Sequence, residues 1–162
     1  MNQNQKMSKN ERDAYDNISE TLFDTSPQLA ELFARLVEAK QPWQQAITAS
    51  DSVRFKLEGI AGEVEFLRYE AAELDQQRPE VVGRIVVAGG DEFAADDELL
   101  ARRAQLLLKA ERLALARPAL EQEFLSHQRR AEVEARNVME IQDQIETLRH
   151  QLRLAAAKRQ AA

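Results

Sequence analysis

The most regular stretch of the chain runs from Leu99 to Ala155 and reads LLARRAQLLLKAERLALARPALEQEFLSHQRRAEVEARNVMEIQDQIETLRHQLRLA. Steps of alternately four and three residues through it reach seventeen positions, of which thirteen are apolar. They are Leu99, Arg103, Leu106, Ala110, Leu113, Arg117, Leu120, Phe124, His127, Ala131, Glu134, Val138, Ile141, Ile145, Leu148, Leu152 and Ala155. This spacing is typical of a coiled-coil seam. It predicts one helix kinked at Pro118; a break at Pro118 that gives a compact bundle is the alternative.

A second stretch repeats the pattern between residues 43 and 78. Its seam positions are Ala46, Ser50, Val53, Leu57, Ile60, Val64, Leu67, Ala71 and Leu74. Gly59 and Gly62 interrupt it, which indicates close approach of a partner helix or, alternatively, a hinge. Residues 43–78 and 96–131 have equal length, so they are predicted to lie antiparallel. The expected fold is all-α: a long antiparallel coiled-coil helical hairpin over residues 42–157, with its tip at 79–95.

Shorter elements are expected before and after this hairpin. Residues 1–10 are polar and predicted to be disordered up to the helix start, where Ser8 and Glu11 fit a capping box. Residues 11–41 are predicted to form two short amphipathic helices, the second beginning at Ser26-Pro27 and ending at Gln41-Pro42. Residues 158–162 are expected to fray.

The tip carries signals for strands. Ile85, Val86 and Val87 are β-branched, and Gly89-Gly90 is a dipeptide that suits a hairpin turn. A small β-hairpin at the tip is therefore one expectation, and an irregular loop is the other.

Composition excludes several classes of chemistry. The chain has 162 residues and no cysteine, which rules out disulfides, thiolate zinc sites and cysteine nucleophiles. The net charge of −6 argues against nucleic acid as a partner. Residues 1–97 hold 10 basic and 19 acidic side chains and residues 98–162 hold 12 and 9, which indicates that an acidic first half lies against a more basic second half. No signal peptide or membrane span is visible, so a cytoplasmic location, or a virion interior, is expected.

The two histidines do not form a recognisable catalytic or metal pattern. His127 and His150 each follow a glutamate by four residues, whereas helical di-iron sites need a spacing of three and further glutamates. Surface ion pairs are the favoured interpretation, and a helical metal-binding enzyme using the Glu/His pairs is the alternative. We expect no enzyme activity, no catalytic residue, no metal site and no cofactor.

The remaining expectation is a non-enzymatic protein–protein interaction module that acts as a scaffold, an adaptor or an inhibitor of a larger assembly. A chaperone-like holdase that uses the apolar tip is the alternative. The predicted partner-binding residues are Ile85, Val86, Val87, Asp91, Glu92, Phe93, Asp96 and Asp97. In the competing interpretation the apolar members fold back and cap the helices.

A homodimer or higher oligomer is also expected. The seam beyond the hairpin needs cover, either from the two N-terminal helices or from a second copy of the chain. The predicted self-association residues are Val138, Ile141, Ile145, Leu148 and Leu152.

Overall fold

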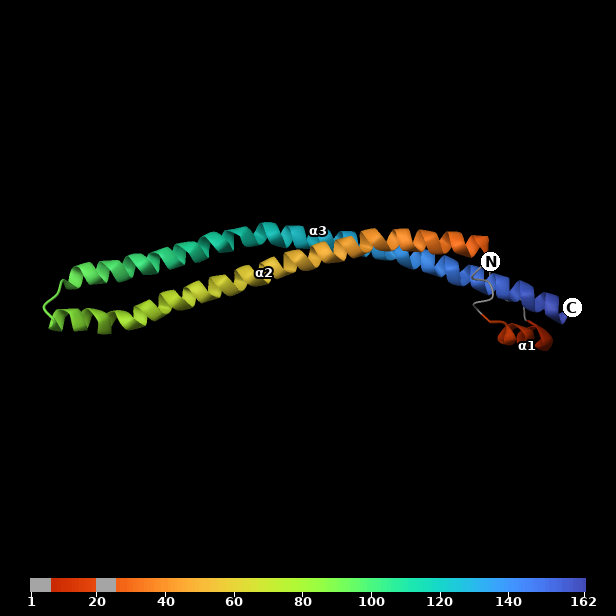
Figure 1. Cartoon of the computed structure of the whole chain (residues 1–162), viewed down its shortest axis with the longest axis horizontal. Helices are drawn as coiled ribbons and strands as arrows, with labels where there is room; N and C mark the ends of the chain where they lie inside the picture. Colours follow the sequence, from red (N-terminus) through yellow and green to blue (C-terminus); the bar gives the residue numbers. More distant parts are fainter. Residues whose placement is uncertain (1–6, 20–25) are drawn as a thin grey trace. The chain divides into compact units, whose positions relative to one another are not determined.

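The computed structural model describes residues 7–19 and 26–162 and contains three helices there (Figure 1). They are α1 (Lys9–Asn17), α2 (Pro27–Val87) and α3 (Glu92–Ala161). Helix accounts for 93% of these described residues and no strand occurs among them. The all-α expectation is therefore confirmed, and the predicted β-hairpin is wrong.

The chain divides into two compact units, each of which includes parts of α2 and α3. Unit 1 contains the residues up to Ile47 together with Arg129–Ala162, and unit 2 contains Thr48–Gln128. Each unit has its own apolar cluster.

Two predicted helix boundaries are wrong because α2 is continuous through Pro42 and Pro79. Proline inside a helix removes one hydrogen bond and crowds the preceding turn, at a cost of about 3 kcal/mol. The alternating spacing continues across Pro42, since Leu36, Ala39, Trp43 and Ala46 are all buried or half-buried. Packing on both sides of Pro42 therefore keeps the helix intact, and residues 27–41 are the beginning of α2 rather than a separate helix. Likewise α3 is unbroken at Pro118, which excludes the break for this helix.

Unit 1 is built around residues from α2 and α3. Its buried cluster contains Leu29, Ala39, Val138, Ile141 and Ile145, with Leu32, Phe33, Leu36, Trp43, Leu148 and Leu152 packed against it. The beginning of α2 thus covers the last part of the α3 seam within one chain.

The short helix α1 also belongs to unit 1 and is attached to α3. The Tyr15 hydroxyl lies 2.6 Å from Nδ1 of His150. Arg153 donates a hydrogen bond of 2.8 Å to the Tyr15 carbonyl oxygen, and its guanidinium lies 4.3 Å from the centre of the Tyr15 ring. These contacts hold α1 against the end of α3.

The two ends of the chain are more helical than predicted where the structure describes them. The capping box is confirmed, because the Ser8 N–H donates to Glu11 Oε2 and the Glu11 N–H donates to Ser8 Oγ. Residues 9 and 10 are helical instead of disordered, while residues 1–6 of that predicted segment lie outside the described part, as do residues 20–25. At the other end α3 reaches Ala161 and Ala157 is fully buried, so residues 158–161, for which fraying is predicted, are part of the helix.

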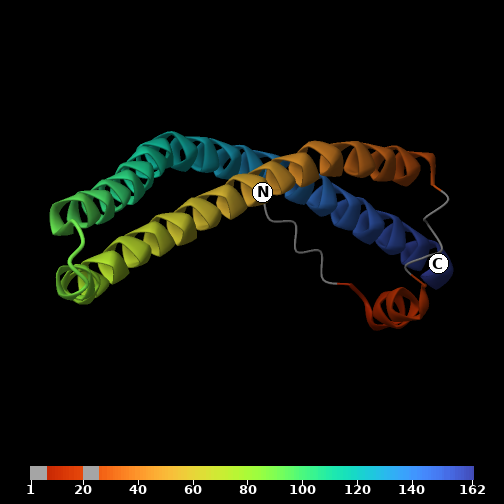
Figure 2. The same cartoon turned by 60° about the vertical axis from the view of Figure 1, so that its left-hand side comes forward.

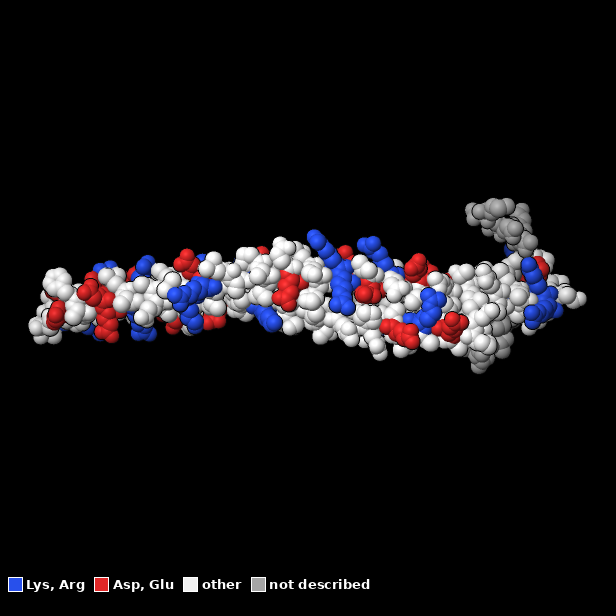
Figure 3. Space-filling model, turned by 90° about the horizontal axis from the view of Figure 1, so that it is seen from above, with Lys and Arg blue, Asp and Glu red and all other residues white. Residues whose placement is uncertain are grey.

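Unit 2 consists of two antiparallel helices that lie side by side (Figure 2). Val64, Leu67 and Ala110 form its buried cluster, and Ile60, Leu106, Leu113 and Ala114 pack against them. The cross-helix ion pairs Glu63–Lys109 (2.9 Å) and Asp75–Arg103 (2.7 Å) lie beside this cluster. Lys and Arg are interspersed with Asp and Glu on the face drawn in Figure 3.

The predicted seam positions are the inward-facing ones along both helices. All nine on α2 are buried or half-buried, and on α3 only Arg117 and Ala155 among the seventeen are exposed. Arg117 directly precedes Pro118, and its side chain pairs with Glu121 on the same helix.

Candidate partner-binding site at the turn

A tight turn joins α2 to α3 in unit 2. The Gly89 N–H donates to the Val86 carbonyl and the Gly90 N–H donates to the Ile85 carbonyl, at 3.1 and 3.0 Å. Gly89 has φ 73°, the left-handed conformation that ends many helices. Gly89-Gly90 therefore terminates α2 as a Schellman motif, which is why neither the strand pair nor an irregular loop forms.

Asp91 begins α3 by capping it. Its Oδ1 accepts hydrogen bonds from the N–H groups of Phe93 and Ala94, both at 3.1 Å. A carboxylate at this position also interacts favourably with the positive end of the helix dipole. Asp91, predicted as a partner-binding residue, therefore has a structural role in the turn.

The apolar residues on either side of the turn are exposed. Val86, Val87 and Phe93, which we call the turn patch, are 48%, 90% and 75% exposed, whereas Ile85 is half-buried. Val87 and Phe93 do not fold back over the helices. This arrangement leaves an apolar surface at the end of unit 2, close to the acidic residues Glu92 and Asp97.

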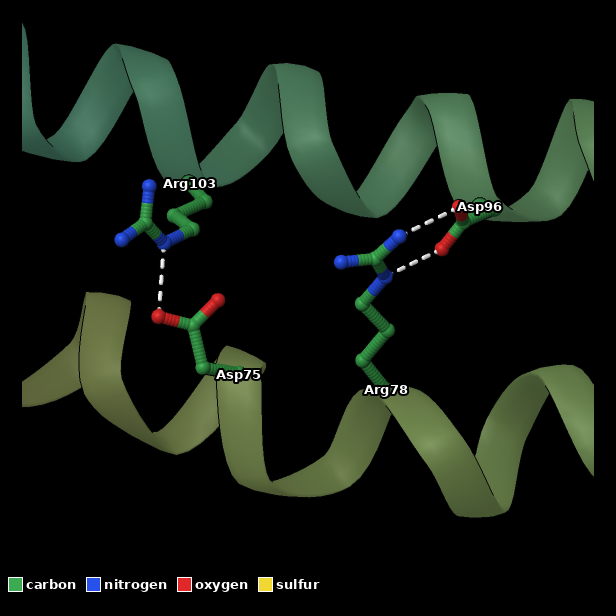
Figure 4. Close-up of polar contacts among 4 residues, drawn as sticks. All are labelled: Asp75, Arg78, Asp96 and Arg103. Carbon is green, nitrogen blue, oxygen red and sulfur yellow. Dashed lines mark hydrogen bonds and ion pairs between the residues drawn. The ribbon is translucent and has the colours of Figure 1, made fainter.

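Further from the turn than the turn patch, two ion pairs connect α2 and α3 (Figure 4). Arg78 donates two hydrogen bonds to Asp96, from Nε to Oδ1 and from Nη2 to Oδ2, the second at 2.6 Å. Arg103 Nε donates to Asp75 Oδ2 at 2.7 Å. Hydrogen bonding from Arg78 lowers the pKa of Asp96, and the same contact raises the pKa of Arg78. Asp96 therefore fixes the two helices together.

A surface groove runs beside these ion pairs. Its volume is about 630 Å³, and it is lined by Asp75, Arg78, Pro79, Val82, Gly83 and Asp96. The groove combines charged and apolar walls next to the turn patch.

The five predicted self-association residues lie inside unit 1. Val138, Ile141 and Ile145 are buried, and Leu148 and Leu152 pack against their cluster. Residues of α2 belong to the same cluster, so the burial of Val138, Ile141 and Ile145 does not require a second copy of the chain. The sequence analysis gives the two N-terminal helices as one possible cover, and the covering residues 29–39 belong to the second of them, which is the beginning of α2.

The two histidines make different contacts. His127 Nε2 lies 3.7 Å from Glu123 Oε1 one turn away, as in the favoured interpretation. His150 instead contacts Tyr15, and its expected partner Glu146 lies 3.4 Å from Arg149. Within residues 7–19 and 26–162, no group of three or more potential metal-binding side chains comes together.

A further set of exposed apolar side chains escaped the sequence reasoning. Phe55, Phe66 and Tyr69 project outward from α2, and Leu108 and Leu115 project outward from α3. The signal was present, because these residues follow a helical spacing of their own on the side opposite to the seam.

Comparison with known proteins finds no matching family model, no matching curated protein and no matching solved structure. Among the described residues, no helix is both long enough and apolar enough to cross a membrane.

Proposed function

We propose that this chain is a non-enzymatic protein–protein interaction module whose paired helices form an antiparallel coiled coil. The seam spacing on both helices and the cross-helix ion pairs of unit 2 support the coiled coil. In this proposal the turn patch binds a protein partner, and the chain acts as a scaffold, an adaptor or an inhibitor of a larger assembly.

The observation that carries the proposal is the exposure of Val87 and Phe93. Two large apolar side chains at the end of a helix pair, with acidic residues around them, have the composition of a docking surface: an apolar centre and a charged rim. The rim contains Glu92, Asp97 and Glu98, so the partner is expected to present an apolar pocket with basic residues around it.

The test is a double substitution, Val87→Ser with Phe93→Ser, followed by affinity capture and mass spectrometry. Burying each apolar side chain contributes about 1.5–3 kcal/mol. Losing both is therefore expected to weaken the affinity for a partner about a hundredfold or more. We expect one or more captured proteins to disappear while the melting temperature stays unchanged.

Val133→Ser with Met139→Ser is the matched control, since these residues are similarly apolar and exposed but belong to unit 1. Capture that is lost equally in this control indicates nonspecific adhesion. A lower melting temperature with capture retained means that the turn patch only stabilises the fold. Either result contradicts the proposal.

The same exposed turn patch also favours a holdase as a second candidate function. A holdase binds unfolded chains through apolar surface without selecting one partner. Suppression of the aggregation of an unrelated denatured protein, lost in the Val87→Ser/Phe93→Ser variant, distinguishes it from an adaptor.

A further inference from the structure

The outer side of α2 in unit 2 carries a second regular stripe. It consists of Ser52, Phe55, Gly59, Gly62, Phe66 and Tyr69, spaced alternately by three and four residues, and we call it the outer α2 face. Phe55, Phe66 and Tyr69 are each more than half exposed. A shallow hollow of about 580 Å³ adjoins Phe55 on this side, lined by Thr48, Asp51, Ser52, Phe55 and Lys56.

Gly59 and Gly62 leave a gap between the aromatic side chains of this face. Both are exposed, and a Cβ atom added to either would meet no atom within 4 Å. Packing inside unit 2 therefore does not require glycine at either position, although glycine weakens a helix. A neighbouring helix that approaches the bare backbone from outside would require it.

The outer side of α3 carries apolar side chains that fit this gap. Ala101, Leu108 and Leu115 are exposed and lie seven residues apart, and we call them the outer α3 face. Leu115 is 73% exposed. Ile60 packs in the same cluster as Leu113 and Ala114, so Leu115 and the glycine pair lie at the same level along unit 2, on opposite outer sides.

Charge is complementary at this level. Residues 58–75 of α2 contain six acidic side chains and one basic, whereas residues 100–117 of α3 contain five basic and one acidic. The ion pairs Glu63–Lys109 and Asp75–Arg103 use two of each within the chain. Glu58 also pairs with Arg54 of the same helix, at 3.9 Å. A surplus of acid still remains on α2, including Glu65, and a surplus of base remains on α3, including Arg102 and Arg112.

We propose that the outer α2 face of one copy binds the outer α3 face of a second copy, with Leu115 seated between Phe55 and Phe66 against Gly59 and Gly62. A second copy is the fitting occupant because this chain itself supplies the basic, leucine-bearing face at the matching level. Pairing of two outer α2 faces would gain no such complementarity, because residues 52–69 contain three acidic and three basic side chains.

This interface joins two different surfaces. In a pair of copies, one outer α3 face and one outer α2 face therefore stay unoccupied. Such head-to-tail contacts continue from copy to copy unless they close into a ring. The proposed self-association is independent of the turn patch and does not use the unit 1 seam that the sequence analysis assigned to it.

Sedimentation velocity of the full chain over a range of concentrations tests the proposal. We expect the average sedimentation coefficient to rise with concentration, and to rise less in 1 M salt, where charges are screened within about 3 Å. The Gly59→Ala/Gly62→Ala variant is expected to associate at least tenfold more weakly while melting at a higher temperature, because alanine strengthens the helix and fills the gap. That combination separates loss of the interface from loss of folding.

A charge exchange gives a second test. Glu58→Lys/Glu65→Lys in one preparation and Arg102→Glu/Arg112→Glu in another are each expected to lose self-association, and an equal mixture to regain it. Val87→Ser/Phe93→Ser, which leaves both outer faces intact, is expected to associate like the unchanged chain. An unchanged chain that stays monomeric at high micromolar concentration, undiminished association of the alanine variant, or a mixture that stays monomeric overturns the proposal.

Discussion

Gly89 and Gly83 lie near the end of α2 and differ in what an added side chain would do. Gly89 has φ 73°, where a Cβ atom is crowded by the backbone, while Gly83 lies inside the helix with open space around it. Gly89→Ala is expected to destabilise the protein by about 1 kcal/mol or more. Gly83→Ala is expected to stabilise it by up to about 1 kcal/mol. Chemical denaturation measures both, and equal signs would contradict the observed turn.

The Arg78–Asp96 pair predicts a pH dependence of stability. The pKa of Asp96 is lowered in the folded protein by hydrogen bonding from Arg78, so the pair stabilises the fold above the ordinary aspartate pKa. Its contribution is lost as the pH falls through the lowered pKa. Asp96→Asn is therefore expected to melt at a lower temperature than the unchanged chain at neutral pH, with the difference shrinking in acid.

Glu80→Gln is the control for this prediction. Glu80 pairs with Arg84 one turn away on the same helix, so its removal disconnects nothing between α2 and α3. Exposed pairs of this kind contribute little to stability. A melting difference for Asp96→Asn that is independent of pH, or no larger than that of Glu80→Gln, would refute the assigned role of Arg78.

At the level of the helix, the three internal prolines test how far packing outweighs local preference. Pro42 lies inside α2, where it removes a backbone hydrogen bond, whereas Pro27 is the first residue of α2, where no such bond exists to lose. Pro42→Ala is expected to stabilise the folded protein by as much as about 3 kcal/mol, and Pro27→Ala by far less. Equal effects in chemical denaturation would mean that α2 is interrupted at Pro42.

Pro42 also shows where sequence reasoning succeeded and where it failed. The seam spacing predicts the continuity of α3 across Pro118. The same spacing crosses Pro42, where the local effect of proline wrongly predicts the end of a helix. The β-branched Ile85-Val86-Val87 segment misled in the same way. Packing along a whole seam decides these helices, and local propensity near one residue does not.

The candidate site was only partly predictable for a related reason. Val86, Val87 and Phe93 stood out as apolar residues near a turn, and the structure exposes them. The bond between Arg78 and Asp96 depends on which residues face each other across the helices, and the exact length of the turn determines that. A hairpin with a different turn would have paired Asp96 with another residue.

Over the whole chain, the uneven distribution of charge has a structural counterpart in unit 2. The pairs Glu63–Lys109 and Asp75–Arg103 place acid on α2 and base on α3, as the contrast between the two halves of the sequence predicted. In the Arg78–Asp96 pair the basic residue is on α2 and the acidic residue is on α3. The general charge balance therefore favours α2 and α3 as neighbours, while individual pairs near the turn follow their own geometry.

Trp43 allows the stability of unit 1 to be followed separately, because it is the single tryptophan and packs against the Ile141 cluster. Ile141→Ala removes buried apolar volume. It is expected to lower the free energy of unfolding, as followed by Trp43 fluorescence, by about 2–5 kcal/mol. Val133→Ala, at an exposed position of the same helix, is expected to change it by less than about 0.5 kcal/mol. The measurement is fluorescence during denaturation at two protein concentrations in high salt, which weakens charged contacts between copies.

The dependence on concentration decides what the α3 seam does. If α2 of the same chain covers Val138, Ile141 and Ile145, the midpoint followed by Trp43 stays the same at both concentrations and the loss caused by Ile141→Ala is equal at each. If two copies shared the seam, the free energy of unfolding would instead rise with protein concentration, because association stabilises the folded dimer. A midpoint that rises with concentration would therefore return the five seam residues to the role of a dimer interface.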